Sequence, residues 1–320
     1  MSAKVVLHTD PIDHPLDEDL QEAIKAAGGA LVGLDPQTDK AYAAHAPDAI
    51  AVLNSDFRLT AERLALLQRC RVISRFGIGV DNIDVAAATA QGIIVTNVPG
   101  FCTEEVADRT WLLLLACACD LLGLDRRVRG GEWREKGLVL SMPIAEHVLG
   151  LIGLGRIGLA VARRAQASKM IVVGYDPFIS GGQMARHGIE RAELDDLLKK
   201  ADFLAITCPL TEETRRLIDA RRMGLMKRTA VLVNCARGAI IDQAALVEAL
   251  KARRIAVAGL DVFDPEPPGK DNPLYHLDNV ILTPHSAATT PDAMRRLRRQ
   301  AAESVIRVFR GERPANAVIP

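Results

Sequence analysis

One short stretch, VLGLIGLGRIGLAVARRA at residues 148–165, constrains the fold more than any other part of the chain. It places Gly153, Gly155 and Gly158 in GxGxxG spacing, directly after an apolar run of strand length and directly before a helix-like run. The first glycine permits a tight turn, the second lets the backbone approach an anion, and the third lets the helix pack on the strand. Glycine-rich turns are common, but this strand and helix context predicts a dinucleotide site on a parallel sheet.

A second apolar run, MIVVGY, ends at Asp176, which lies about 20 residues beyond the glycine turn, as this type of site requires. A carboxylate at that place accepts hydrogen bonds from both ribose hydroxyls of NAD and repels the 2′-phosphate of NADP. We therefore expect NAD (NADH) as the cofactor. The alternative is a turn that carries three glycines and binds nothing.

Short apolar runs alternate with helix-like runs along the chain, a pattern typical of parallel sheets covered by helices. The first series of strand-like runs lies near Lys4 to His8, Ala49 to Leu53, Arg71 to Arg75 and Ile93 to Thr96. The second series is VLGLI, MIVVGY, DFLAI, AVLVN, IAVAGL and NVILT. A chain of 320 residues exceeds the usual size of one core, so we expect two domains.

The segment between the two series begins with the turn-rich NVPG at Asn97 to Gly100, which we predict as the first domain boundary. After it we expect one long helix from about Thr103 to Leu122, in a segment too long for a simple connector. Its apolar tract, Trp111 to Leu124, is interrupted by Asp120 and is too short to span a bilayer, so it predicts a buried helix. The segment is a candidate arm or oligomer contact.

Charge and cysteine content exclude several classes of partner. The chain has 40 Lys and Arg against 40 Asp and Glu, so its zero net charge gives no reason to expect nucleic acid or a membrane surface as a partner. Its six cysteines form no CxxC pair and have no metal-like spacing with histidine, so we expect neither a disulfide framework nor a metal site. The first residues have no signal-peptide pattern, and the cytoplasm is the simplest compartment.

Three polar residues follow apolar runs of the second series. Arg237 lies in LVNCARGAIID, Glu266 lies in GLDVFDPEPP beyond Asp261, and His285 lies in LTPHSAATT. Each residue alone has an ordinary interpretation without function: a solvated arginine, a surface glutamate and a packed histidine, one of seven in the chain. Because the carboxyl ends of parallel strands meet at one edge of a sheet, we expect the three side chains to lie together.

A second glycine loop occurs in SRFGIGVDNID, where Gly77 and Gly79 follow the run that ends at Arg75. It has no third glycine, so it is not a second dinucleotide turn. Its backbone N–H groups could hold a small anion, and a sharp loop without a ligand is the equal alternative.

The motifs IGLGRIG, YDP, CPLTEET, LVNCARGAIID, GLDVFDPEP and LTPHSA, in this order, resemble those of the D-isomer-specific 2-hydroxyacid dehydrogenases. GIGVDNID and NVPGFCTEEVAD extend the resemblance over nearly the whole chain, and NVP followed by EEVAD is similar to the branch that includes the C-terminal-binding-protein corepressors. The resemblance implies an α/β fold with a central Rossmann-type doubly wound sheet for NAD at 100–286. It implies a flavodoxin-like substrate domain at 1–99, completed by 287–320, and a homodimer formed through the long helix after Pro99.

The resemblance also implies a role for each polar residue. Arg237 would bind the substrate carboxylate and polarise the 2-oxo group, and His285 would give or take the proton. Glu266 would hydrogen-bond the other ring nitrogen, so that a proton is available near neutral pH. The implied cofactor residues are Arg156 and Ile157 at the pyrophosphate, Cys208 and Thr214 near the adenosine, and Cys235, Ala236 and Asp261 near the nicotinamide. Gly77, Ile78 and Gly79 would hold the carboxylate through backbone N–H groups.

Some positions depart from the family pattern. Asn54 stands where phosphoglycerate dehydrogenases often carry a basic residue, and this difference weakens the case for a phosphorylated substrate. Ser286 to Thr289 follow the histidine where the corepressor branch has a tryptophan. Lys169 stands where a glycine commonly precedes the next strand, and the lead-in LSMPIAEHVLGLIG lacks its usual glycine and lysine.

These observations predict an NAD-dependent D-2-hydroxyacid dehydrogenase that reduces a small unphosphorylated 2-oxo acid. Within the family, the alternatives are a hydroxypyruvate or glyoxylate reductase and a phosphoglycerate dehydrogenase. A different class, an NAD(H)-sensing dimeric scaffold of the corepressor type, is the further alternative. Arg237, Glu266 and His285 together favour the enzyme, because a sensor does not need an acid paired with a histidine.

Overall fold

The computed structural model describes residues 4–133 and 143–318. The chain forms two compact units: a first unit of Met1–Phe101 with Thr290–Pro320, and a second unit of Cys102–Thr289. Both are α/β units with parallel sheets, so the expected fold class is confirmed. We describe each unit by itself.

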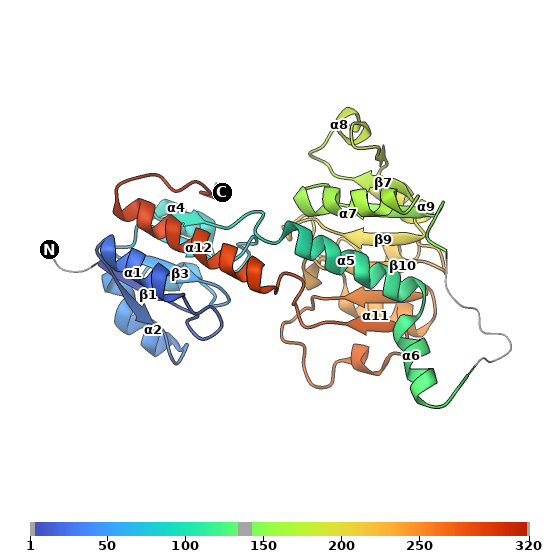
Figure 1. Cartoon of the computed structure of the whole chain (residues 1–320), viewed down its shortest axis with the longest axis horizontal. Coiled ribbons are helices and arrows are strands. Elements are labelled where there is room, and N and C mark those ends of the chain that lie inside the picture. Colours follow the sequence, from blue (N-terminus) through green and yellow to red (C-terminus); the bar gives the residue numbers. More distant parts are fainter. Residues whose placement is uncertain (1–3, 134–142, 319–320) are drawn as a thin grey trace. The chain divides into compact units, whose positions relative to one another are not determined.

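The first unit is built around a five-stranded sheet in the order β2-β1-β3-β4-β5. Its strands are β1 (Lys4–His8), β2 (Gly29–Gly33), β3 (Ala49–Asn54), β4 (Val72–Arg75) and β5 (Ile94–Thr96). Its helices are α1 (Glu18–Ala26), α2 (Asp39–His45), α3 (Ala61–Leu64), α4 (Val85–Ala90) and α12 (Pro291–Phe309), with the 3-10 turn η1 (Ala46–Asp48). The order is the flavodoxin-like one, and its direction reverses between β1 and β3. The last helix, α12, lies beside α1 and packs on β4 (Figure 1).

The second unit is built around a seven-stranded sheet in the order β12-β11-β10-β9-β6-β7-β8. Its strands are β6 (Val148–Ile152), β7 (Ile171–Tyr175), β8 (Glu190–Arg191), β9 (Phe203–Ile206), β10 (Val231–Asn234), β11 (Val257–Leu260) and β12 (Val280–Leu282). Its helices are α5 (Thr103–Ala118), α6 (Leu121–Arg129), α7 (Arg156–Ala167), α8 (Gly181–Ala185), α9 (Leu194–Lys200), α10 (Ala220–Met223) and α11 (Gln243–Lys251), with η2 (Gly238–Ile240) and η3 (Pro273–His276).

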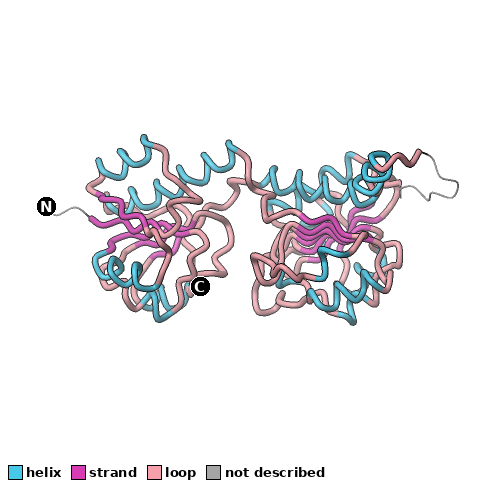
Figure 2. Tube along the Cα trace, turned by 90° about the horizontal axis from the view of Figure 1, so that it is seen from below, coloured by secondary structure: helices cyan, strands magenta, loops and turns pink. Residues whose placement is uncertain are grey.

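Helices cover both faces of this second sheet (Figure 2). The central strands are therefore buried on both sides, and β9 and β10 consist of buried residues throughout. The chain winds outward through β6, β7 and β8 and then returns to β9 on the other side of β6. The reversal between β6 and β9 is the doubly wound pattern, which opens a crevice for ligands at the carboxyl ends of the strands.

The prediction of one long helix from Thr103 to Leu122 is wrong, because the structure has two helices, α5 and α6, with a break at Asp120. Asp120 adopts a left-handed conformation with φ 48° and ψ 41°, which a short polar side chain tolerates better than most. The expectation of a buried helix is also wrong, because Leu112, Leu121 and Leu122 are exposed. Only one face of α5 packs on the sheet.

Two strands were absent from the prediction: β2, which follows the glycine stop of α1, and the two-residue strand β8, which is polar and exposed. In the lead-in to the glycine turn, residues 140–142 lie outside the described residues. None of the helices within the described ranges is long and apolar enough to cross a membrane.

Candidate active site

The glycine turn joins β6 to α7 and depends on the absence of side chains. Gly153 has a φ of +91°, and a Cβ atom there would lie 2.6 Å from the backbone nitrogen of Cys208. A Cβ atom on Gly158 would lie 2.2 Å from the carbonyl oxygen of Gly153. Larger residues would therefore push the turn away from the loop after β9 or lift α7 off the turn.

Gly155 differs from the other two glycines, because a Cβ atom there would meet no atom within 4 Å. It is the N-cap residue of α7 and has no side chain that could bond to the first N–H groups of the helix. The first N–H groups of a helix have no partner inside the helix, and those of Arg156 and Ile157 belong to this first turn. The open space and the helix N-terminus fit the pyrophosphate of a dinucleotide.

Asp176 lies directly after β7 and is tied to the glycine turn. Its Oδ2 accepts a hydrogen bond of 2.9 Å from the backbone N–H of Leu154, and its Oδ1 accepts one of 2.9 Å from that of Phe178. Burial raises the pKa of the Cys208 thiol to about 11, and the charge of Asp176 adds to the rise. The structure thus brings Asp176 and Cys208 close together beside the turn.

Thr214 lies in an exposed turn of the loop that follows β9 and contains Cys208. Its hydroxyl donates to the carbonyl of Pro209 at 2.7 Å and accepts from the N–H of Thr211 at 2.7 Å. It therefore shapes the loop that begins at Cys208.

His285 and Glu266 are in direct contact beyond the ends of β12 and β11. The ring Nδ1 of His285 lies 2.6 Å from Oε2 of Glu266, and Oε1 of Glu266 accepts a 2.8 Å hydrogen bond from the N–H of Phe263. Burial by itself would raise the pKa of Glu266, but the hydrogen bond and charge of His285, the Phe263 N–H and the charge of Arg237 together lower it. Glu266 is therefore a carboxylate that fixes the orientation of the imidazole.

Arg237 reaches this pair from the loop after β10. Its charge acts on Glu266, and its carbonyl oxygen accepts a 2.9 Å hydrogen bond from the side-chain amide of Asn234. The next residue, Gly238, lies against the following loop, where a Cβ atom would be 2.0 Å from the carbonyl carbon of Phe263. This close backbone approach brings Arg237 and Glu266 together, so the structure assembles the three polar residues as the sequence predicts.

Asp261 holds the loop that carries His285. Its side chain is 0 % exposed, its carbonyl oxygen accepts from the N–H of His285 at 2.7 Å, and its carboxylate accepts from the N–H groups of Ser286 and Ala287 at 3.1 and 2.8 Å. The hydroxyl of Thr283 donates to the same carboxylate. Asp261 thus bonds the histidine loop, and its predicted place near the nicotinamide stays a prediction.

Cys235 and Ala236 lie in the turn after β10. Burial raises the pKa of the Cys235 thiol to about 12; a hydrogen bond with Thr110 opposes the rise, the charge of Asp261 adds to it and that of Arg109 opposes it. The N–H of Ala236 donates to Oδ1 of Asn234 at 3.0 Å. Both predicted residues therefore lie at the same edge of the sheet as Asp261.

The sequence prediction missed Arg109, which reaches this edge from α5. Its Nη1 donates to the hydroxyl of Ser286 at 3.2 Å and lies 3.8 Å from Oδ1 of Asp261. No local motif marks Arg109, because it lies in the middle of a helix whose buried residues are apolar apart from Thr110. Only the packing of α5 on the sheet reveals the contact.

The loop Gly77–Gly79 belongs to the first unit, at the carboxyl end of β4. Gly77 has a φ of +150°, and its carbonyl oxygen accepts from the N–H of Val98 at 2.8 Å. The carbonyl oxygen of Ile78 accepts from the side-chain amide of Asn97 at 2.7 Å. The predicted role of this loop in holding a carboxylate stays a prediction.

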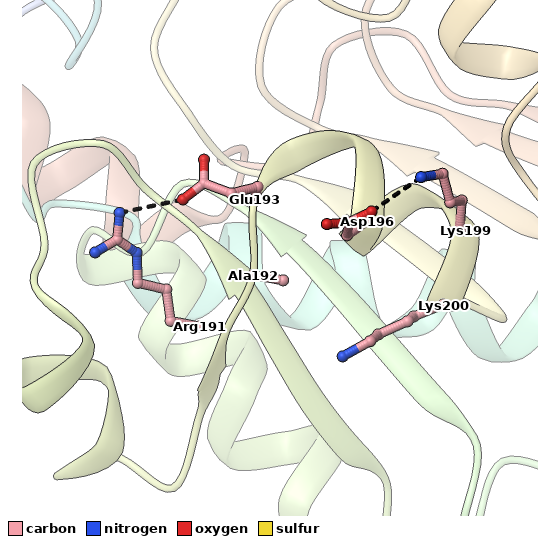
Figure 3. Close-up of a pocket in the computed structure, with 6 residues that line it drawn as sticks. All are labelled: Arg191, Ala192, Glu193, Asp196, Lys199 and Lys200. Carbon is pink, nitrogen blue, oxygen red and sulfur yellow. Dashed lines mark hydrogen bonds and ion pairs between the residues drawn. The ribbon is translucent and has the colours of Figure 1, made fainter.

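One surface hollow lies apart from the predicted site residues, between β8 and α9 (Figure 3). The charged side chains of its walls are paired, Arg191 with Glu193 at 3.4 Å, Lys199 with Asp196 at 2.9 Å and Lys200 with Glu190 at 2.6 Å. It is an open, charged surface that shares no residue with the candidate active site.

The second unit coincides closely with a known family of domains. The family model described as "D-isomer specific 2-hydroxyacid dehydrogenase, NAD binding domain" matches residues 111–287. Among solved structures, a D-lactate dehydrogenase from Aquifex aeolicus in complex with NAD and lactic acid is 28% identical with a TM-score of 0.89, covering 99% of each chain. A cofactor of the NAD type therefore belongs to the second unit.

Curated relatives extend the similarity beyond that domain. A glyoxylate reductase from Korarchaeum cryptofilum is 42% identical over 274 residues, which are 85% of this chain and 82% of the relative. A D-3-phosphoglycerate dehydrogenase from Methanocaldococcus jannaschii is 40% identical over 308 residues, which are 96% of this chain and 58% of the relative. The chain thus spans little more than half the length of the second relative. It belongs to the D-isomer specific 2-hydroxyacid dehydrogenase family, whose NAD-binding domain its second unit contains.

Proposed function

We propose that this protein is an NAD-dependent D-2-hydroxyacid dehydrogenase that works as the reductase of a small, unphosphorylated 2-oxo acid. The observation that carries the proposal is the 2.6 Å contact between His285 and Glu266, with the charge of Arg237 acting on the same carboxylate. This arrangement provides an oriented proton donor beside a cation that can bind a carboxylate.

The geometry assigns a task to each ring nitrogen of His285. Nδ1 donates to the Glu266 carboxylate, so Nε2 is the nitrogen left to give its proton to the 2-oxo group in reduction and to remove it in oxidation. Arg237 binds the substrate carboxylate and stabilises the charge that develops on the oxygen. NADH supplies the hydride.

The cofactor residues follow the shape of the glycine turn. The pyrophosphate would lie on the N-terminus of α7, at Arg156 and Ile157, where Gly155 leaves open space. Asp176 would accept the ribose hydroxyls through the lone pairs that Leu154 and Phe178 leave free. We propose that Cys208 and Thr214 lie near the adenosine of the bound cofactor. Cys235, Ala236 and Asp261 would lie near its nicotinamide.

We assign substrate binding to a domain of residues 1–99, completed by 287–320, and NAD binding to residues 100–286. Within the described residues, the backbone N–H groups of Ile78 and Gly79 have no hydrogen-bond acceptor. Consecutive free N–H groups in a glycine loop form a concave anion site, which supports a role in holding the substrate carboxylate.

The preference for an unphosphorylated substrate rests on Asn54. Its side chain is buried, its amide nitrogen donates to the carbonyl of Phe57 at 2.7 Å, and its amide oxygen accepts from Asn82 at 3.1 Å. The amide is used inside the loop and brings no positive charge for a phosphate. A glyoxylate or hydroxypyruvate reductase is therefore favoured over a phosphoglycerate dehydrogenase.

A homodimer formed through α5 and α6 is part of the proposal. Large apolar side chains are exposed on these helices and just beyond them: Leu112, Leu121, Leu122, Val128 and Trp133. Contiguous patches of exposed apolar side chains are common at protein interfaces, and we propose that these residues contribute to one. A location in the cytoplasm, as predicted from the sequence, stays a prediction.

The deciding experiment is a substrate panel. Purified protein is mixed with NADH or NADPH and a set of 2-oxo acids that includes glyoxylate, hydroxypyruvate, pyruvate and phosphohydroxypyruvate. We expect oxidation of NADH with at least one unphosphorylated acid and slower oxidation of NADPH. NADH that drives dimerisation without turnover of any acid would instead support the scaffold.

A further inference from the structure

We propose that Arg109 is a positioning residue for His285, which it holds in its reactive orientation through Asp261 and Ser286. The proposal rests on the proposed function, because only a proton donor has a reactive orientation. The contacts of Arg109 with Asp261 and Ser286 do not depend on that function. Nothing in the sequence motifs assigns a role to Arg109.

The packing of α5 explains how Arg109 reaches the site. Arg109, Leu113 and Cys117 are spaced by four residues and therefore lie on one stripe of the helix. A Cβ atom on Gly259 of β11 would lie 3.1 Å from Cβ of Leu113 and 3.3 Å from Sγ of Cys117. One turn closer to the N-terminus of α5, Arg109 meets Asp261, just past the end of the same strand.

The buried carboxylate of Asp261 needs a cation. It is 0 % exposed, whereas Arg109 is 27 % exposed and lies 3.8 Å away. A buried charge is tolerated only when it is paired and hydrogen-bonded, and removing one partner of such a pair is costly. Arg109 thus supplies the positive charge beside the carboxylate that accepts the N–H groups of Ser286 and Ala287.

The backbone of His285 depends on these bonds. His285 has a φ of +47°, a conformation that residues other than glycine adopt only when their surroundings impose it. Asp261 binds three successive N–H groups of this loop, from His285 through its carbonyl and from the next two residues through its carboxylate. Arg109 also binds the Ser286 hydroxyl, so it contacts the residue adjacent to the histidine as well as the carboxylate that orders it.

The test compares Arg109→Met, which keeps the length of the side chain and removes its charge, with Arg109→Lys, which keeps a charge. Arg163→Met is the control, because Arg163 of α7 also pairs with a carboxylate, Glu104 of α5, but both of these side chains are exposed. The readouts are kcat and KM with the 2-oxo acid that the wild type turns over, the Kd of NADH from its fluorescence, and the ring NMR signal of His285, assigned from its loss in His285→Ala.

For Arg109→Met we expect kcat to fall about 10- to 100-fold, since small displacements of a reacting group have effects of this size. The Kd of NADH should stay within about twofold and the His285 signal should move, whereas Arg109→Lys should recover part of kcat and Arg163→Met should match the wild type. Unchanged kcat and an unmoved His285 signal in Arg109→Met would overturn the proposal. If Arg109→Met fails to fold, Arg109→Lys decides by the same signal.

If the wild type itself turns over no acid, the proposed function fails. The NMR signal then still tests whether Arg109 positions His285.

Discussion

The carboxyl edge of the seven-stranded sheet has two halves that are built in different ways. The half around β6 and β7 is shaped by missing side chains: Gly153 and Gly158 stand where a Cβ atom would collide with backbone. The half beyond β10, β11 and β12 is shaped by charged side chains from three separate loops, Arg237, Glu266 and His285. Mutations in the first half should alter cofactor binding, and mutations in the second should alter the chemical step.

The largest effect is expected for His285→Ala. Without the proton donor, kcat should fall by about 10³- to 10⁴-fold, in the upper range for general acid–base groups. The Kd of NADH should stay within about twofold, because the glycine turn is untouched. Stopped-flow turnover and NADH fluorescence measure the two quantities separately.

His276→Ala is the matched control, because His276 is an exposed histidine on η3. It should behave as the wild type. Loss of NADH binding together with turnover in His285→Ala would show that the two halves are not separable and that the histidine supports the fold.

The second effect concerns Glu266→Gln, which removes a charge and keeps the shape. We expect kcat to fall about 10- to 100-fold, as for the loss of a group that orients a catalytic base. The amide can still accept one hydrogen bond from the ring, so part of the orientation of His285 should remain, and the Kd of NADH should not change. An unchanged kcat would contradict the assigned role.

The same substitution has a consequence for stability. Because the folded state lowers the pKa of Glu266 from its ordinary 4.5, its carboxylate stabilises the fold above that pH and loses this contribution as the pH falls through the lowered value. The difference in thermal stability between the wild type and Glu266→Gln should therefore be larger at pH 7 than at pH 3. Glu248→Gln, on the exposed side of α11, is the control.

The third effect belongs to the cofactor half. Asp176→Ala removes the carboxylate that would repel the 2′-phosphate, so the preference for NADH over NADPH should narrow by about 10-fold. The kcat with saturating NADH should change little, in contrast to the substitutions around His285. Ratios of kcat/KM for the two cofactors provide the measurement, and an unaltered ratio would refute the role of Asp176.

The sequence predicts these two halves to different extents. The glycine turn and Asp176 were recognisable because they lie close together in one βα unit with fixed spacing. Arg237, Glu266 and His285 were predictable as strand-end residues, but their 2.6 Å contact and the backbone approach at Gly238 depend on tertiary packing. Arg109 was missed for the same reason, because its partner Asp261 is far away in the sequence.

Local conformation accounts for the other differences. The break at Asp120 was missed because the apolar tract continues on both sides of it, and a left-handed residue leaves no periodic signal. β8 has only two residues, both charged, so neither alternation nor apolarity marks it. Strand positions in the buried sheets were predictable because their apolar runs are continuous.

The smallest effect is expected at the opposite, amino edge of the same sheet, where the structure explains a departure from the family pattern. Lys169 precedes β7 with a φ of +63°, and its carbonyl oxygen accepts a 2.9 Å hydrogen bond from Glu146, which has a φ of +66° and precedes β6. Left-handed backbone costs a residue with a side chain about 1–2 kcal/mol, and glycine avoids this cost while losing about 0.5–1 kcal/mol in chain entropy. This is why a glycine is usual before β7.

Lys169→Gly should therefore raise the free energy of unfolding by about 0.5–1 kcal/mol, measured by urea denaturation. The neighbouring substitution Ser168→Gly should lower it, because Ser168 has an ordinary φ of −91° and gains nothing from glycine. Neither change should alter kcat or the Kd of NADH, since both residues lie at the end of the sheet away from the site. A Lys169→Gly protein that is less stable than the wild type would show that contacts of the lysine side chain outweigh the cost of its left-handed backbone. A changed kcat would show that residues at the amino edge of the sheet also affect the reaction.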